Sequence, residues 1–190
     1  MARWEPNPRQ RLVRAALDLF TEQGYDNTTV AQIAERAGLT KTTFFRHFPN
    51  KREVLFAGQD IHGRLLADGI AGAPSTAAPL EAVAAGLDTL TESFVPEQRE
   101  FGPQLRAVIA EHSELQEREA FKRAHLAEAM TEALRKRGVP DLAASLAADL
   151  GVRAFSQGFT RWVEPANRTS FGELARQELD ELRAAVRTLV

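Results

Sequence analysis

The feature that most constrains the fold is a stretch from residue 28 to residue 51, TTVAQIAERAGLTKTTFFRHFPNK, with the pattern of two short helices joined by a tight turn. Thr29 lies three residues before Gln32, which is the spacing of a capping box, and apolar residues then recur at helical intervals. Gly38 would end this helix, because glycine adopts the left-handed backbone conformation that other residues resist. Thr40 can cap a second helix. The stretch therefore predicts a helix-turn-helix unit.

The second helix of this unit is predicted to expose its polar face. Phe44 and Phe48 are spaced to pack inward. The other side chains of its first turns are hydroxylic, cationic or aromatic, and they are Lys41, Thr42, Thr43, Phe45 and His47. In a helix-turn-helix that reads DNA, the start of the second helix enters the major groove, where such side chains meet base edges and phosphates. We therefore predict a DNA-reading surface on this helix.

The charge of the chain is unevenly distributed. Residues 1–52 hold nine Lys or Arg and five Asp or Glu, a balance of +4, whereas residues 53–190 hold fifteen and twenty-one, a balance of −6. These balances sum to the net charge of −2. A basic head on an acidic body suits a DNA-reading module joined to a second function, because only the contacting face must displace the counterions of DNA.

Length and composition indicate a globular protein. A chain of 190 residues with 44% hydrophobic and 26% charged residues can bury a sizeable core. It has no cysteine, which excludes disulfides and thiolate metal sites. The start of the sequence lacks the apolar core of a signal peptide, and no uncharged apolar run is long enough to cross a bilayer. We therefore expect a soluble cytoplasmic protein.

Helical patterns on either side of the central stretch predict an all-α fold with two domains. Asn7 begins a first helix and Gly24 ends it, which completes a three-helix DNA-binding head of residues 1–52. Arg3 and Trp4 precede it, in an arm that fits a frayed terminus better than a DNA contact. A helix from about 50 to 71 is predicted to link the head to a helical ligand-binding and dimerisation body of residues 53–190.

The last two helices have the pattern of a dimer interface. Small residues recur every three or four positions along the first of them, at Ala143, Ala147, Gly151, Ala154 and Gly158. Ser170 and Glu173 form a capping box for the last helix, whose apolar residues repeat close to every 3.5 positions. Long apolar faces on two adjacent helices suit a four-helix interface with a second copy of the chain.

The segment from Arg9 to Glu53 closely resembles the head of the TetR (tetracycline-repressor-like) family of bacterial transcriptional regulators. The resemblance implies a homodimer formed through the last two helices, and release from a DNA operator when a small molecule enters the body. It also places eight residues at positions that usually face DNA, namely Thr29, Thr40, Lys41, Thr42, Thr43, Phe45, His47 and Lys51. Two of them depart from the family pattern, which commonly has tyrosine at Phe45 and glycine or another small residue at Thr42.

An effector pocket is predicted among the body helices. Its candidate residues are Leu87, Phe94, Phe101, Leu105, Ile109, His112, Phe121, Met130, Phe155, Phe159 and Trp162. Core packing is the simpler explanation for each apolar member, and His112 also fits a wet helix face. We expect an apolar effector, such as a fatty acyl compound or an aromatic antibiotic. The sequence favours none of these over the others.

Two alternatives to a ligand-responsive repressor stay open. The chain could be an all-helical enzyme that uses the head as a scaffold, or a DNA-binding module without an effector. An enzyme would need converging acid, base and metal-binding residues, and no such set is found. His125 and Glu128 share a helix face, but a single pair is weak evidence for a metal. We therefore predict no enzymatic activity, cofactor or metal. A near-palindromic operator is expected, because one recognition helix makes too few base contacts.

Overall fold

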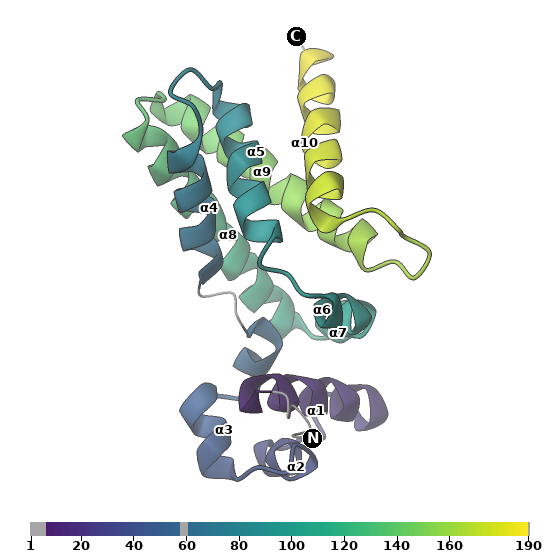
Figure 1. The fold of residues 1–190 in the computed structure, drawn as a ribbon. Coiled ribbons are helices and arrows are strands. Elements are labelled where there is room, and N and C mark those ends of the chain that lie inside the picture. Colours follow the sequence, from purple (N-terminus) through teal and green to yellow (C-terminus); the bar gives the residue numbers. More distant parts are fainter. Residues whose placement is uncertain (1–6, 58–60, 190) are drawn as a thin grey trace, which may run out of the picture. The chain divides into compact units, whose positions relative to one another are not determined.

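The computed structural model describes residues 7–57 and 61–189 of the chain. All the regular secondary structure in these ranges is helical, which confirms the predicted all-α class (Figure 1). The described residues form two compact units. The head unit contains residues 7–57 and 101–117, and the body unit contains residues 61–100 and 118–189. Arg3 and Trp4 lie outside the described residues.

The head unit is built from short helices around α1. They are α1 (Pro8–Gln23), α2 (Val30–Arg36), α3 (Lys41–His47), the 3-10 helix η1 (Arg52–Phe56), α7 (Gly102–Glu111) and the first turn of α8 (Ser113–Lys136). α1 packs against α2, η1 and α7. Leu12, Ile33 and Phe44 are completely buried in its core. Val108, Ile109 and Leu115 belong to the same apolar cluster. The segment 101–117 therefore helps to fill the core of the head.

The body unit is a bundle of longer helices. It contains α4 (His62–Gly72), α5 (Pro79–Thr91), α6 (Pro96–Glu100), the rest of α8, α9 (Asp141–Trp162) and α10 (Phe171–Arg187). α4 packs on α5, α5 on α9 and α9 on α10 (Figure 1). α4 and α5 cross closely at Gly69 and Gly86, since a Cβ atom added at Gly69 would lie 2.7 Å from the Gly86 Cα. Glycine is required at this crossing because a larger side chain would push the helices apart.

Side-chain caps start several helices where the sequence predicted them. Thr29 and Gln32 form the capping box of α2, and the Thr40 hydroxyl accepts a hydrogen bond from the Thr43 amide at the start of α3. Ser170 and Glu173 form the capping box of α10. These bonds satisfy amide groups that lack an intrahelical partner, so they fix where each helix begins.

The prediction of one continuous linking helix from about 50 to 71 is wrong. η1 ends at Phe56, and Ala57 follows with extended backbone at ψ 131°. α4 begins only at His62. The Asn50 side chain accepts a hydrogen bond from the Glu53 amide, as a helix cap would. The apolar spacing indicated a helical register on both sides of the break but carried no signal for the break itself.

Arginine side chains tie helix ends of the body together. The Arg137 guanidinium donates to the carbonyls of Ile70 and Ala73 at 3.1 and 2.9 Å, and so satisfies the end of α4. The Arg99 Nε donates to the carbonyl of Trp162 at 2.9 Å, at the end of α9. Arg137 and Arg99 are thus bonded to backbone carbonyls of the body unit.

Candidate DNA-binding surface and effector region

The turn between α2 and α3 is short and well bonded. Gly38 adopts a left-handed conformation with φ +64°. The Leu39 amide donates to the carbonyl of Ala34 at 2.8 Å, which closes the turn over the end of α2. Phe44 is completely buried and Phe48 is 2% exposed, so α3 is anchored by its inward aromatic face. This anchoring leaves the opposite face of α3 at the surface.

Most of the eight residues predicted to face DNA are exposed. Thr29, Thr40, Lys41, Thr42 and Phe45 are exposed, whereas Thr43, His47 and Lys51 are half-buried. The Phe45 side chain is 52% exposed and meets the buried Phe44 ring edge to face at 5.5 Å. An exposed aromatic ring beside hydroxyl groups and a lysine is suited to contact with thymine methyl groups, sugars and phosphates.

Two of the predicted contact residues have polar atoms engaged or turned inward. The Thr43 and Thr40 hydroxyls lie 3.0 Å apart and share a hydrogen bond. The His47 Nε2 atom is buried without a hydrogen-bond partner among the described residues. A contact between His47 and DNA would therefore have to use another edge of the ring.

Lys51 is held by the loop between α1 and α2. Its Nζ atom donates to the carbonyl of Tyr25 at 2.6 Å and lies 4.0 Å from the centre of the Tyr25 ring. Burial lowers the pKa of Lys51, while the nearby carboxylates of Asp26 and Glu114 oppose this effect. For the predicted phosphate contact, Lys51 would have to exchange the Tyr25 carbonyl for a phosphate oxygen.

Tyr25 connects this loop to the start of α8. Its hydroxyl donates to Glu114 Oε1 at 2.5 Å, and its ring packs against Phe20 and His112 at centroid distances of 5.0 and 5.1 Å. Burial of the phenol raises the pKa of Tyr25 well above its usual value, and the hydrogen bond to Glu114 raises it further. The neutral phenol is therefore the form that the head unit stabilises.

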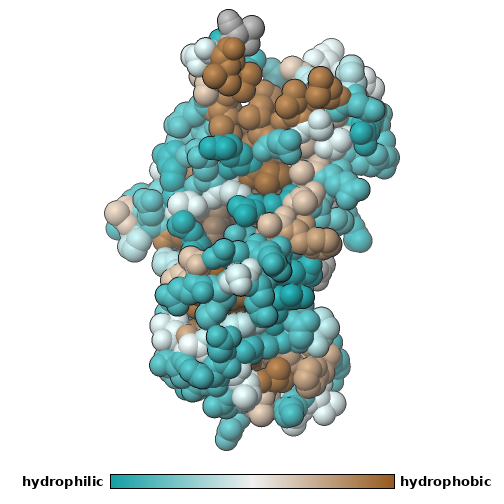
Figure 2. Space-filling model, turned by 180° about the vertical axis from the view of Figure 1, so that it is seen from behind, coloured by the Kyte–Doolittle hydropathy of each residue, from teal (hydrophilic) through white to brown (hydrophobic). Residues whose placement is uncertain are grey.

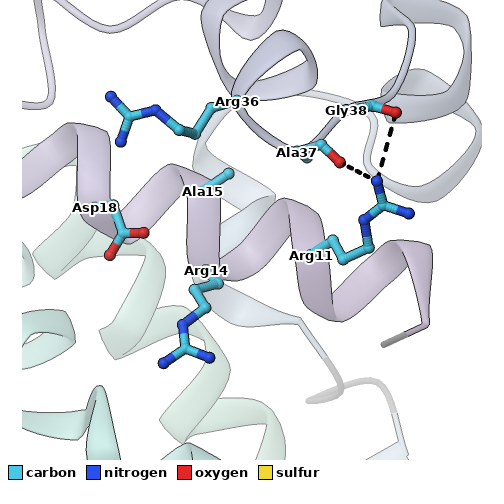
Figure 3. Close-up of a pocket in the computed structure, with 7 residues that line it drawn as sticks. All are labelled: Arg11, Arg14, Ala15, Asp18, Arg36, Ala37 and Gly38. Atoms are coloured by element: carbon cyan, nitrogen blue, oxygen red, sulfur yellow. Dashed lines mark hydrogen bonds between the residues drawn. The ribbon is translucent and has the colours of Figure 1, made fainter. Parts of the chain in front are cut away.

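An open crevice of about 390 Å³ lies between α1 and the end of α2. Figure 3 shows the Arg11 guanidinium pointing at the backbone carbonyls of Ala37 and Gly38. Arg36 lies on the other side of the crevice and is ion-paired to Glu22, with nitrogen to oxygen distances of 2.9 and 2.7 Å. The arginines around the crevice are thus engaged with the protein itself.

Sequence reasoning missed Arg11, Tyr25 and Glu114. Arg11 and Ala37 are 26 residues apart, and Tyr25 and Glu114 are 89 residues apart. Neither pairing belongs to a local motif, so no spacing rule would have found it. Arg11 precedes the buried Leu12 in α1, and the apolar spacing of that helix is the one local signal that bears on its position.

The predicted effector residues fall into separate environments. Leu87, Phe94, Met130, Phe155, Phe159 and Trp162 lie in or against the apolar core of the body unit. Phe101, Leu105, Ile109 and His112 instead lie in the segment 101–117 of the head unit. Phe121 is 64% exposed, with the Arg118 guanidinium over its ring at 5.2 Å. The eleven residues are therefore divided between the two units.

An aromatic cluster forms the part of the body core next to α6. Phe94 contacts Phe155, Phe159, Trp162 and Phe171 with ring centroids 4.9 to 6.3 Å apart. His62 adjoins this cluster, with its ring 5.3 Å from that of Phe94. Rings at these distances are in direct contact.

Apolar side chains gather on the surface of the body unit near the end of α10 (Figure 2). Leu142 and Leu146 on α9 are 73% and 56% exposed, and Val186 on α10 is 42% exposed. Leu189, just beyond α10, is 84% exposed. Large apolar patches on a protein surface commonly mark interfaces.

The described residues contain neither a candidate metal site nor a candidate membrane-spanning helix. No group of three or more His, Asp or Glu residues in residues 7–57 and 61–189 could hold a metal ion. In the same ranges, no helix is long and apolar enough to span a bilayer.

Comparison with known proteins identifies the head. The sequence-family model for bacterial regulatory proteins of the tetR family matches residues 12–57. These residues run from α1 through α3 to the end of η1. The head of the chain thus has the sequence of a TetR-family DNA-binding domain. The expected resemblance is confirmed over residues 12–57.

Two curated HTH-type transcriptional regulators match parts of this chain. The transcriptional regulator TcmR of Streptomyces glaucescens is 56% identical over 46 residues, which are 24% of this chain and 20% of TcmR. The regulator BetI of Rhizobium meliloti is 33% identical over 121 residues, 63% of this chain and 57% of BetI. The chain thus matches less than two thirds of the length of these curated relatives.

A solved structure of another protein resembles nearly the whole chain. The complex of SmeT with triclosan matches 94% of this chain and 90% of SmeT with a TM-score of 0.58 and 24% sequence identity. SmeT is the repressor of a multidrug efflux pump of Stenotrophomonas maltophilia. At this identity the similarity establishes a shared fold.

Proposed function

We propose that this protein is a homodimeric transcriptional repressor of the cytoplasm that binds a near-palindromic DNA operator and leaves it when an apolar small molecule binds the body. The observation that carries the proposal is the exposed start of α3, with Lys41, Thr42 and Phe45 at the surface of a TetR-family head. In a helix-turn-helix protein this is the part that enters the major groove.

The proposed DNA contacts are the eight residues predicted from the sequence. Thr40, Thr42, Thr43, Phe45 and His47 would lie in or beside the major groove, with Thr29, Lys41 and Lys51 at the flanking phosphates. One good bidentate base contact contributes roughly 1–3 kcal/mol of discrimination, so a single α3 is insufficient for a specific site. Two heads separated by about one turn of B-DNA, roughly 34–36 Å, would double the number of contacts.

The proposed dimer interface consists of α9 and α10. Leu142, Leu146 and Val186 expose apolar surface on these two helices. A second copy of the same face would bury the exposed leucines. The predicted seam of small residues does not form part of this face, because Gly151 packs against Met130 and Gly158 against Ala175 of the same chain. The interface would also set the distance between the two heads, on which operator binding depends.

The proposed effector site is the aromatic cluster of the body. Phe94, Phe155 and Phe159 are only half-buried, although they pack against its fully apolar core. An apolar ligand could replace some of these ring contacts with its own at little cost in hydration. It would release DNA by stabilising a body conformation with the heads at a different spacing, and its effect is limited by its differential affinity for the two states.

A gel-shift titration tests the proposal. It uses DNA from upstream of the chain's own gene and is repeated over a range of salt concentrations. Each lost phosphate contact lowers the slope of log K against log salt by about 0.9, so Lys41→Ala should lower it by about 1.8 in a dimer. Lys136→Ala, which removes a 73% exposed lysine side chain of the body, is the matched control and should leave the slope unchanged. Equal slopes for both variants and the wild type would contradict the proposed surface.

Sedimentation of Leu146→Glu tests the dimer. The variant should be monomeric and should lose cooperative operator binding, because it places a charge in the proposed interface. Phe121→Glu is the control, since it puts the same charge at another exposed apolar residue of the body, 64% exposed. A dimeric Leu146→Glu protein would refute the assignment of this face.

A further inference from the structure

We propose that Arg11 is a positioning residue for DNA recognition: its guanidinium fixes the turn between α2 and α3, and so sets the direction from which α3 meets a base sequence. This inference rests on the DNA binding proposed above. It assigns a role to a residue of α1, outside the helix-turn-helix itself and outside the eight proposed DNA contacts.

The geometry shows a side chain bound to the backbone of the turn. Arg11 Nη2 donates to the carbonyl oxygen of Ala37 at 2.5 Å and approaches that of Gly38 at 3.5 Å (Figure 3). Ala37 is the C-cap of α2, so its carbonyl lacks an intrahelical donor. A cation at this place also interacts favourably with the negative end of the α2 dipole. Arg11 therefore satisfies the last turn of α2 both as a donor and as a charge.

The turn that Arg11 holds connects α2 directly to α3. Gly38 and Leu39 alone separate the C-cap of α2 from Thr40, the N-cap of α3. A change in the backbone dihedrals of these two residues would swing the start of α3, where the proposed base contacts lie. Fixing the carbonyls of Ala37 and Gly38 against α1 restrains those dihedrals.

The lack of a side chain at Gly38 suits this turn for two reasons. Its φ of +64° lies in the left-handed region, where a side chain is strained. A Cβ atom at Gly38 would also lie 2.8 Å from Arg11 Nη2, which is closer than such atoms approach. The absence of a side chain at residue 38 thus permits both the turn and the access of the guanidinium to it.

The neighbouring arginines provide a contrast within the same crevice. Arg36 is ion-paired to Glu22, and in Figure 3 the Arg14 side chain points away from the two carbonyls. Among the residues that line the crevice, Arg11 is the one drawn with hydrogen bonds to the turn. Arg14 is therefore a suitable control for a loss of charge in this region that leaves the turn intact.

The test compares specific and non-specific DNA binding by Arg11→Met and Arg14→Met. Methionine keeps an unbranched apolar stem but cannot donate to the carbonyls. Arg11→Met should weaken operator binding roughly 10- to 100-fold, the equivalent of about one good base contact. Binding to unrelated DNA should change less than about twofold, and the salt slope should stay at the wild-type value, because no phosphate contact is lost. Arg14→Met should keep the wild-type ratio of specific to non-specific affinity.

Two further measurements separate positioning from a general loss of folding. The Gly38 and Leu39 amides donate to the carbonyls of Glu35 and Ala34, and their hydrogen exchange should be faster in Arg11→Met while the exchange of α1 stays unchanged. Arg11→Lys should recover part of the operator affinity, because lysine restores the charge and one donor but lacks the forked geometry.

The possible outcomes are distinct. A fall in salt slope of about 0.9 per head, with equal losses for both kinds of DNA, would make Arg11 a phosphate contact and overturn the proposal. A specificity ratio equal to that of Arg14→Met would overturn it as well. If the wild-type protein binds no DNA, the proposed function fails instead, and the exchange rates still decide whether Arg11 holds the turn.

Discussion

Replacement of Tyr25 by phenylalanine should destabilise the head unit by about 1–1.5 kcal/mol at neutral pH. The substitution removes the hydroxyl that donates to Glu114 Oε1 at 2.5 Å and keeps the ring. Hydrogen bonds to charged groups contribute about 1.5–3 kcal/mol. The expected value lies at or below the lower end of this range, because Glu114 is exposed and its carboxylate would be hydrated again after the change. The ring contacts with Phe20 and His112 should be retained.

The same substitution should change how stability depends on alkaline pH. Burial and the bond to Glu114 raise the pKa of Tyr25 in the folded protein above its usual value of 10.0. A group whose pKa is raised by folding stabilises the folded state fully below its unfolded pKa, and this stabilisation is lost as pH rises above that value. Above pH 10.0 the free energy of unfolding of the wild type should therefore fall as Tyr25 favours ionisation in the unfolded chain. The Tyr25→Phe protein has no phenol to ionise, so the free energies of unfolding of the two proteins should converge.

Urea unfolding of both proteins, at neutral pH and above pH 10.0, measures both effects. The chain has a single tyrosine, so the ultraviolet absorbance of the phenolate in a pH titration reports Tyr25 directly. Glu114→Gln is a useful companion, because it keeps an acceptor oxygen and removes the charge. The reasoning is refuted if Tyr25 ionises at or below pH 10.0 in the folded wild type, or if the phenylalanine variant is as stable as the wild type at neutral pH.

Three further substitutions test the helix starts and the close crossing of the body. Thr29→Ala should cost about 1 kcal/mol in urea unfolding through loss of the α2 cap, and Thr29→Ser should retain most of it; equal losses would contradict the role of the hydroxyl. Gly86→Ala should cost about 1–3 kcal/mol, since its Cβ would lie 2.8 Å from the carbonyl of Leu66, and an unchanged melting temperature would rule out the tight crossing. The hydrogen bonds from Ser170 lower the pKa of Glu173 in the folded protein. This shift stabilises the folded state above the usual pKa of 4.5, and the stabilisation is lost as pH falls through the pKa of the folded protein. Ser170→Ala should therefore destabilise the protein at neutral pH and by less in acid; a penalty that does not shrink on acidification would argue against this linkage.

The parts of the fold that the sequence predicted depend on short-range chemistry. The capping boxes at Thr29 and Ser170 join residues three positions apart, and Gly38 was assigned from the conformational freedom of glycine. The resemblance to the TetR family is confirmed over residues 12–57, which include Thr29 and Gly38. The assignment of individual residues to DNA and to an effector stays a prediction.

The parts that the sequence did not predict depend on pairings between distant residues. Ile109 was predicted only as a candidate for the effector pocket, and nothing in its local sequence shows that it joins Val108 in the core of the head. The eleven effector candidates shared only an apolar or aromatic character, and that character is the same in the head core and in the body core. Periodicity identifies the buried face of a helix, whereas the partner of that face is decided by the fold.

The contribution of residues 101–117 to the head core has a consequence for synthesis of the protein. Val108, Ile109 and Leu115 are translated long after the recognition helix, yet they fill the same apolar cluster. A nascent chain that ends before them would expose the apolar surface they cover, so the DNA-reading unit should mature only after the ribosome has passed Glu117. For the same reason, a hybrid regulator that borrows this head should also carry α7 and the first turn of α8, or else a redesigned surface on α1.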